Sequence, residues 1–344
     1  MRLLVLGGTR FVGRAVVEEA LGRNHEVTTF NRGQTGVDLA GVEAVRGDRE
    51  SPADLQGLAT GRSWDVVVDS SGYVPRVVGD AARALVGRAG GYVFLSTISV
   101  YPDWPTKGVS EASPLYECSP DAGGSAVDEA TWSATKYGSF KAGCERAVAE
   151  VFGNRALVLR PGVILGPHEN VGRLTWWLDR IARGGRVLGP GKPDRSIQPI
   201  DVRDVAEFAL DLAESGHAGA FNVAAPKGHA TFGSMLAHCA HSTSSYGELV
   251  WVDDEFLVEH GVRQWTEIPL WRLHQGTWDA DTTMAESAGL TCRPLAETVR
   301  DTWAWMAEGG RPAPYGRQAQ HGLSPERERQ LLALWEARAD QGRS

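Results

Sequence analysis

Short apolar runs alternate with longer amphipathic segments over the first two-thirds of the chain. The runs that we interpret as strands are Arg2–Leu6, Glu26–Phe30, Val42–Val45, Asp65–Asp69, Tyr92–Leu95 and Ala156–Leu159. Most of them are unbroken apolar stretches, as expected for strands that helices cover on both faces. Amphipathic stretches such as Val12–Leu21 and Ser133–Phe152 predict helices between the strands. This alternation predicts an α/β fold of the Rossmann type, with a doubly wound parallel sheet.

The pattern becomes less regular in the remaining third of the chain. A stretch rich in Ser, Pro, Gly and Glu from Ser110 to Gly124 predicts a long loop, and loops of that length are usually functional or mobile. The later predicted elements are helices over Leu174–Arg183 and Val202–Ala213, a strand over Phe221–Ala224 and a charged helix over Glu326–Ala339.

These elements predict three parts. Residues 1–165 are expected to form the domain that contains the doubly wound sheet. Residues 166–310 are expected to form a smaller α/β region that returns some segments to that domain. Residues 311–344 are expected to form a tail with a charged helix.

Composition narrows the functional classes. The 344 residues are 42% hydrophobic and 23% charged, which is ordinary for a globular protein, and the net charge of −8 argues against a general grip on nucleic acid. No run of about 18 apolar residues occurs, so no membrane span is expected. We interpret the apolar start of the chain as a buried strand and not as a signal peptide. The scattered cysteines Cys118, Cys144, Cys239 and Cys292 form no metal or disulfide pattern, so we expect no metal and a reducing cytoplasm.

A glycine-rich loop joins the first strand to the first helix. Gly7 and Gly8 follow Leu6 and Gly13 stands at the start of the predicted helix, where glycine lets the backbone turn tightly and approach a pyrophosphate at the helix amino end. Because the loop sits between a strand and a helix, it predicts a dinucleotide site.

The end of the second strand bears on the choice of cofactor. Sites that prefer NAD usually carry Asp or Glu there, but this chain has Arg32, and Arg10 lies in the glycine loop. Two guanidinium groups can hold a 2′-phosphate, so we expect NADP(H) to be favoured over NAD(H); two solvated arginines are the alternative. Asp48 is a candidate partner of the adenine amino group, or an ordinary turn residue.

A hydroxyl-rich strand end precedes a Tyr–Lys pair. Tyr137 and Lys141 are four residues apart and share one face of the predicted helix, where the ammonium can lower the tyrosine pKa. Thr97 follows the fifth strand and can hold the substrate oxygen. We therefore predict that Thr97, Tyr137 and Lys141 are the catalytic residues.

These motifs resemble the NAD-dependent epimerase/dehydratase family of extended short-chain dehydrogenase/reductases, over nearly all of Met1 to Met306. The resemblance rests on the glycine loop, Thr97, Tyr137, Lys141, Arg160-Pro161, Gly166-Pro167, the segment Ile200–Ala206, Gly289-Leu290 and Arg293–Leu295. The sequences GGTRFVG and FNRG are similar to the chloroplast stem-loop-binding proteins and to isoflavone-reductase-like bacterial proteins. Arg10 departs from the family, because it replaces the central glycine of the loop.

The resemblance and the motifs together predict that residues 1–165 are an NAD(P)-binding Rossmann domain that carries the catalytic residues and that residues 166–310 mainly bind substrate. They also give the predicted cofactor-binding set. Its members are Gly7, Thr9, Arg10, Phe11, Val12, Gly13, Asn31, Arg32, Asp48, Arg49, Ser70, Ser71, Gly72, Ser96, Tyr137, Lys141, Pro161, Gly162 and Val163.

The substrate side is predicted less directly. Its candidates are Tyr73, Ser99, Tyr101, Trp104, His168, Trp177 and Gln198. Nucleotide-sugar epimerases that resemble this chain carry Asn near Val163 and Arg near Ile197, and this chain has neither. Trp251, Trp265, Trp271 and Trp278 are expected to fill the core or to stack on a ring-shaped substrate.

Three functions remain open. The first is an NADPH-dependent reductase or dehydrogenase of a small carbonyl or alcohol. The second is an NAD(P)-dependent epimerase or dehydratase of a sugar or nucleotide-sugar. The third is an RNA-binding protein with a vestigial nucleotide site, against which the catalytic residues and the acidic charge both count. A small-molecule substrate is the expected partner, with a homodimer as the candidate assembly.

Overall fold

The computed structural model describes residues 1–124, 133–245, 247–312 and 322–341. Seven parallel strands form one sheet in the order β11-β6-β5-β4-β1-β2-β3. They are β1 (Arg2–Leu6), β2 (Glu26–Asn31), β3 (Glu43–Arg46), β4 (Trp64–Asp69), β5 (Ala89–Leu95), β6 (Ala156–Pro161) and β11 (Gly219–Val223). The predicted strands and the predicted doubly wound sheet are confirmed.

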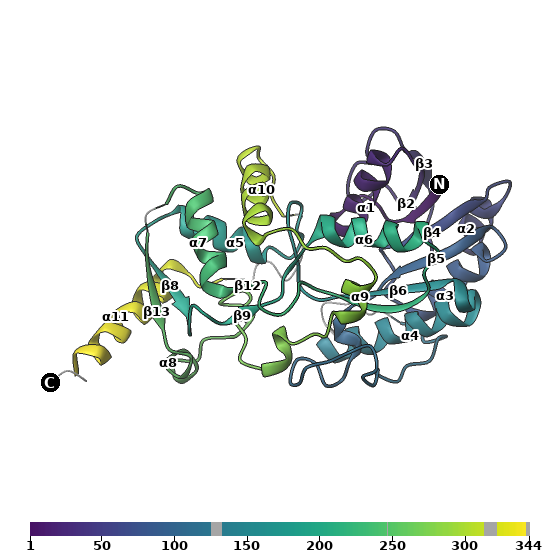
Figure 1. Ribbon diagram of the computed structural model, residues 1–344. Coiled ribbons are helices and arrows are strands. Elements are labelled where there is room, and N and C mark those ends of the chain that lie inside the picture. Colours follow the sequence, from purple (N-terminus) through teal and green to yellow (C-terminus); the bar gives the residue numbers. More distant parts are fainter. Residues whose placement is uncertain (125–132, 246, 313–321, 342–344) are drawn as a thin grey trace.

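Helices cover both faces of this sheet, as Figure 1 shows. Successive strand residues point to opposite faces, so Leu3 and Val5 join one core while Leu4 and Leu6 join another. The helices over the first core are α1 (Phe11–Gly22) and α6 (Val202–Glu214). Those over the second are α2 (Pro52–Ala59), α3 (Pro75–Leu85) and α4 (Ala134–Phe152). Burial on both faces explains why the strands are unbroken apolar runs.

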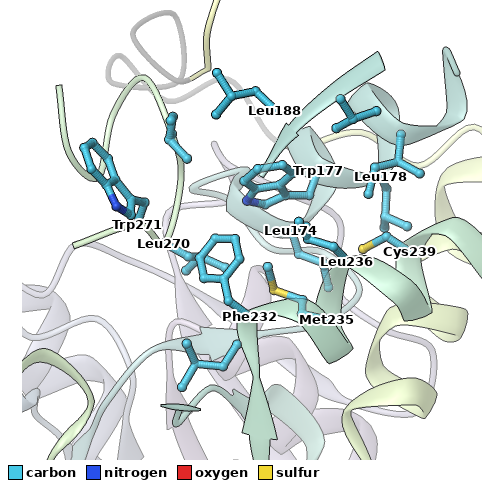
Figure 2. Packing of buried hydrophobic residues seen from close by; sticks show 14 of the residues in the cluster. Leu174, Trp177, Leu178, Leu188, Phe232, Met235, Leu236, Cys239, Leu270 and Trp271 are labelled. Atoms are coloured by element: carbon cyan, nitrogen blue, oxygen red, sulfur yellow. The ribbon is translucent and has the colours of Figure 1, made fainter. Parts of the chain in front are cut away.

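The second half of the chain builds a separate core around β8 (Arg186–Pro190), which pairs in parallel with β13 (Glu248–Val252). The helices around this core are α5 (Arg173–Ala182), α7 (Phe232–Ser242), α8 (Asp254–Glu259) and α10 (Leu295–Ala307). Figure 2 shows Trp177 among Leu174, Leu188 and their neighbours. The division of the chain at residues 165 and 310 stays a prediction.

Apart from the tail, the remaining elements are short. They are η1 (Ile98–Val100), η2 (Gly153–Arg155), β7 (Ile164–Leu165), β9 (Ser196–Ile197), β10 (Ile200–Asp201), β12 (Ala230–Thr231), η3 (Gln275–Trp278) and α9 (Thr283–Ser287). The predicted loop before Gly124 contains no helix or strand among its described residues. In the described part of the chain, no helix combines the length and the apolar character that crossing a membrane requires.

The tail forms α11 (Pro325–Gln341), as predicted, and packs on the second core. Leu331 and Leu332 are buried there. The carboxylate of Glu328 accepts hydrogen bonds from the Arg180 guanidinium and from the Leu188 amide. The tail helix is therefore anchored by a buried ion pair as well as by apolar contact.

Candidate active site

The glycine loop forms a tight cradle at the carboxyl end of β1. Gly7 has φ of 106°, in the left-handed region that favours glycine. A Cβ there would lie 2.8 Å from Ser70 Oγ, and a Cβ at Gly13 would collide with the same oxygen. Ser70 and Ser71 both donate to the Leu6 carbonyl, at 3.1 and 3.0 Å. The turn after β4 is thus packed directly against the loop.

The amino end of α1 suits a pyrophosphate. The first turn holds Phe11, Val12 and Gly13 and no acidic residue, and the Arg10 side chain makes no capping hydrogen bond within the described structure. The first-turn amides of a helix lack intrahelical acceptors, and the helix dipole favours an anion beside them. These features fit a dinucleotide, whose pyrophosphate the loop and the first turn of α1 would hold.

The end of β2 is more crowded than the sequence predicts. Asn31 donates to the Gly7 carbonyl at 3.3 Å and to Asp38 at 2.9 Å, and Arg46 forms an ion pair with Asp38. Asp38 and Arg46 were not predicted site residues, because neither is adjacent to the strand end in sequence. A carboxylate therefore does lie near the end of β2, already engaged by neighbouring donors.

Arg10 and Arg32 lie at this end of the sheet, and both belong to the predicted 2′-phosphate site. Arg10 Nε donates to the Thr35 carbonyl at 2.9 Å, which ties the loop after β2 to the glycine loop. Thr9 contacts the same residue through its hydroxyl, at 3.3 Å. Arg32 makes a long ion pair of 3.8 Å with Asp48, and both side chains are exposed. An exposed ion pair of this kind contributes little to stability, so an anionic ligand can replace Asp48 as the partner of Arg32 at little cost in free energy.

Arg49 has a buried position below the turn after β4. Its guanidinium makes two 2.7 Å hydrogen bonds to Asp69 and one of 3.0 Å to Ser71. Burial raises the pKa of Asp69, but the charge and hydrogen bonds of Arg49 outweigh burial and hold that pKa below its usual range. Arg49 thus orders the turn through Ser70, Ser71 and Gly72.

Tyr137 and Lys141 lie one turn apart on α4, as predicted. Ser133 caps the helix by accepting from the Lys136 amide at 3.0 Å. Lys141 is buried and donates to the Leu95 carbonyl and, at 2.9 Å, to the Gly72 carbonyl. Its ammonium lies 4.2 Å from the Phe94 ring and 5.4 Å from the Tyr73 ring. Burial lowers the pKa of Lys141 to about 8.

The turn that carries Thr97 packs directly on α4. A Cβ at Gly138, next to Tyr137, would collide with the Ser99 carbonyl oxygen. Thr97 Oγ1 accepts from the Ser99 amide at 3.2 Å, and both residues are half-buried. The Tyr73 ring centre lies 6.5 Å from that of Tyr137. The structure therefore brings Thr97, Ser99 and Tyr73 to the helix that carries the Tyr–Lys pair.

A buried polar network lies behind this group and was not predicted. Glu145, one turn after Lys141, accepts from Ser96 and forms a 2.7 Å ion pair with Arg160. Arg160 also donates to the Tyr101 hydroxyl at 2.8 Å, and that hydroxyl donates to Asn222 at 2.8 Å. The spacing of Lys141 and Glu145, together with a lone arginine in an apolar strand, was the available signal, because buried charges need partners.

This network corrects two predicted roles. Tyr101 is fully buried, and burial raises its pKa to about 12, so it is no substrate contact. Ser96 is also buried and is bound to Glu145, which leaves its hydroxyl committed within the protein.

Two further substrate candidates are structural. Trp177 is fully buried in the second core, and its indole N–H donates to the Pro269 carbonyl at 2.8 Å (Figure 2). Gln198 is buried and bridges the backbone of Ala225 and Ala280, with bonds of 2.9 to 3.1 Å. Both predictions fail because core packing and backbone hydrogen bonds occupy these side chains.

The remaining predicted residues lie on segments around the sheet edge. Pro161 ends β6, Gly162 donates to the Val223 carbonyl at 3.0 Å, and Val163 accepts from the Ile200 amide at 2.9 Å. His168 is half-buried with its ring centre 5.0 Å from that of Trp305, and burial followed by the Arg14 charge lowers its pKa. His168 therefore lies beside Trp305 of α10.

The late tryptophans mostly fill the second core. Trp271 is fully buried there and Trp278 nearly so, while Trp251 and Trp265 are partly buried against the same core. Trp104 is half-buried and packs on the cluster that contains Ile98. Two roles were predicted for these tryptophans, filling the core and stacking on a ring-shaped substrate. Trp271 has the first role.

Comparisons with known proteins agree with this fold. The model of the NAD dependent epimerase/dehydratase family matches residues 3–83. A chloroplast stem-loop binding protein of 41 kDa b from Arabidopsis thaliana is 24% identical over 255 residues, which are 70% of this chain. The aligned part spans only 62% of that relative's length.

Solved structures share the architecture at low identity. The Bordetella bronchiseptica enzyme WbmH, in complex with NAD+, is 17% identical with a TM-score of 0.67, covering 90% of this chain and 99% of WbmH. UDP-glucose 4-epimerase from Thermotoga maritima is 16% identical with a TM-score of 0.64, covering 90% of this chain and 99% of the epimerase. The family match over residues 3–83 and the shared fold confirm the predicted resemblance to the NAD dependent epimerase/dehydratase family.

Proposed function

We propose that the chain is an NAD(P)(H)-dependent oxidoreductase, and more narrowly an NADPH-dependent reductase or dehydrogenase of a small carbonyl or alcohol. The observation that carries the proposal is the packing of the Thr97–Ser99 turn on α4 beside Tyr137 and Lys141. This group lies at the carboxyl edge of the sheet, where ligands of doubly wound folds bind. The glycine cradle lies at the same edge.

The residues divide the work of a carbonyl reduction. The nicotinamide cofactor, when bound, supplies the hydride. Tyr137 gives its hydroxyl proton to the substrate oxygen, and Thr97 donates a hydrogen bond to that oxygen. Lys141 stabilises the resulting tyrosinate by its positive charge. With a pKa of about 8, Lys141 is mostly charged at neutral pH.

Support for NADP(H) comes from the charges at the end of β2. Arg10 and Arg32 are both present there, and Asp38 is engaged by Thr29, Asn31 and Arg46. A carboxylate that already accepts from these donors is poorly available to a ribose 2′-hydroxyl. Arg32 needs only to give up its exposed pair with Asp48 to contact a 2′-phosphate.

Epimerisation or dehydration is the second candidate, because several proteins of similar fold are described as nucleotide-sugar epimerases. Against it, Ile197 is fully buried where those enzymes that resemble this chain carry Arg, and Gln198 clamps the backbone. RNA binding is suggested only by the description of the chloroplast relative. Filter binding of RNA over a salt series tests it, since phosphate contacts weaken steeply with salt.

The deciding experiment follows the hydrogen. Candidate ketones and aldehydes are incubated with stoichiometric NADPH that carries deuterium at its transferable position. A reductase oxidises the cofactor one-for-one and places deuterium in the product. Conversion of a sugar or nucleotide-sugar without net change in nicotinamide absorbance would overturn the proposal in favour of epimerisation or dehydration.

A further inference from the structure

Arg272 lies between two indole rings that come from distant parts of the chain. Its guanidinium carbon is 5.3 Å from the Trp104 ring centre and 5.1 Å from the Trp265 ring centre. The Trp265 ring centre is in turn 6.1 Å from that of Trp278. We call Trp104, Trp265, Trp278 and Arg272 the tryptophan–arginine cluster. Cations are attracted to indole faces, so the arginine is held in place without an acidic partner.

The backbone fixes this cluster next to the catalytic turn. Val109 donates to the Asp279 carbonyl at 3.1 Å and accepts from the Asp281 amide at 2.8 Å, which ties the loop of Trp104 to the segment of Trp278. A Cβ at Gly276 would collide with the Lys107 backbone. Trp104 also packs on the apolar group that contains Ile98, the neighbour of Thr97.

The donors of this cluster lack acceptors. Arg272 is half-buried and has neither an ion pair nor a hydrogen bond within the described residues, and its partial burial lowers its pKa. The indole N–H groups of Trp104 and Trp278 and the hydroxyl of Thr277 are buried and have no hydrogen-bond partner in the described part of the chain. Arg160 and Arg180 differ, because each is buried and pairs with a carboxylate.

An unmatched set of donors identifies the kind of ligand. Guanidinium and indole N–H groups can only donate, so the missing partner must accept several hydrogen bonds. A half-buried cation without a counter-ion attracts an anion, and buried indole N–H groups without acceptors cost free energy that a hydrogen-bond acceptor removes. Trp265 and Leu270 have φ of 69° and 71°, a strained conformation for non-glycine residues that is concentrated at ligand clamps.

We propose that the tryptophan–arginine cluster binds the anionic group of the substrate, a carboxylate or a phosphoryl group. This inference rests on the proposed function, because it takes Tyr137 as the group that acts on the carbonyl of the same molecule. The substrate is then an acidic carbonyl compound, with its anion on Arg272 and its reacting oxygen at Tyr137 and Thr97.

The test titrates the full chain with two probes, benzoate as the carboxylate and inorganic phosphate as the phosphoryl group. Intrinsic tryptophan fluorescence reports binding, at ionic strength held constant with chloride. One of the two anions should saturate the signal, and Arg272→Gln should weaken its Kd by about 10- to 100-fold. The control Arg263→Gln removes an exposed arginine of the same segment and should stay within about twofold of the original chain.

Folding of the variants does not limit the test. Phenylglyoxal labelling of the unaltered chain, read by mass spectrometry, should modify Arg272 more slowly when the anion is present, with Arg263 unaffected. Equal Kd values in the original chain and Arg272→Gln, no saturable signal with either anion, or no protection of Arg272 would overturn the anion site.

Parallel NADPH titration and turnover separate this inference from the proposed function. Tyr137-dependent turnover of a carbonyl without any effect of Arg272→Gln on KM refutes the anion site and leaves the oxidoreductase intact. Arg272-dependent anion binding without NADPH binding or turnover refutes the oxidoreductase and leaves an anion site.

Discussion

The sheet region and the segment that carries Arg272 differ in how their charged groups are paired. In the sheet region, buried charges are paired within the protein, as in Arg49 with Asp69 and Arg160 with Glu145. In the second core, large rings such as Trp177 and Trp271 fill the volume and one buried pair joins Arg180 to Glu328. The nearby Arg272 lies against two indole rings and forms no ion pair within the described residues. Paired charges serve to position reacting groups, whereas an arginine without an ion pair is suited to receive an anionic ligand.

Removing the Tyr137 hydroxyl should have the largest effect, because it removes the proton donor of the sheet edge. Tyr137→Phe is expected to lower kcat by about 10²- to 10⁴-fold on the best carbonyl substrate. Tyr73→Phe is the matched control, since its ring lies near Tyr137 and Lys141, and it should lose less than about tenfold. Near-normal turnover of Tyr137→Phe would remove Tyr137 from its assigned role.

Breaking the buried Arg160–Glu145 pair should destabilise the sheet region more than breaking an exposed ion pair does. Glu145→Gln leaves the Arg160 charge uncompensated and also disturbs Ser96, so the free energy of unfolding should fall by about 3–5 kcal/mol. Glu326→Gln, which alters an exposed pair with Arg329, should change it by less than about 1 kcal/mol. Urea denaturation measures both, and equal values would contradict the contrast.

Two tryptophans distinguish core from ligand site. Trp177→Leu removes a fully buried ring and its bond to Pro269, and should cost about 2–3 kcal/mol of stability. Trp104→Leu should cost less stability but weaken anion binding, because Trp104 covers one side of Arg272. Thermal or urea unfolding checks the first effect and fluorescence titration the second. The opposite pattern would show that the two roles are exchanged.

The preference for NADPH over NADH tests the proposed role of Arg32 at the end of β2. Arg32→Ala should weaken NADPH binding by about 1.5–3 kcal/mol, the contribution of a charge-assisted hydrogen bond, and leave NADH binding unchanged. Titration of both cofactors against nicotinamide fluorescence measures this. Arg62→Ala, at an exposed arginine paired with Glu43, is the control. An equal loss for NADH and NADPH would argue for a general effect on the fold.

The buried ammonium predicts a modest pH dependence. The pKa of Lys141 is about 8 in the folded protein and 10.5 in a solvated lysine, so between these values the unfolded state holds more protons. Stability contributed at Lys141 is therefore lowest below pH 8 and rises with pH, by at most about 1.4 kcal/mol per unit. Urea unfolding of the original chain and Lys141→Met should show this slope only in the former. Equal slopes of stability against pH in the two proteins would show that the Lys141 ammonium is solvated in the folded state.

The contrast between the regions also explains what the sequence could predict. Strands buried on both faces are unbroken apolar runs, and Gly7, Tyr137 and Lys141 stand at spacings that chemistry dictates, so both were visible without coordinates. Trp177 and Gln198 were misassigned because a side chain's burial depends on segments distant in sequence, here Pro269 and Ala280.

Asp38 and Arg272 escaped prediction for the same physical reason. Asp38 reaches the end of β2 by a loop that folds back, and Arg272 meets Trp104 only through tertiary contact. The local periodicity of the sequence carries no information on such tertiary contacts. Glu145 differs, because its spacing from Lys141 and the lone charge of Arg160 in an apolar strand could have revealed the pair.

The absence of a side chain at Gly138 has a consequence for how this protein tolerates change. Any Cβ at this position would push α4 away from the Ser99 carbonyl, and the hydroxyls of Tyr137 and Thr97 would separate with it. Position 138 should therefore accept a single residue type in a survey of all substitutions, although glycine has no reactive group to offer. A mutation at position 138 can therefore abolish activity by separating the hydroxyls of Tyr137 and Thr97, although every catalytic side chain is still present.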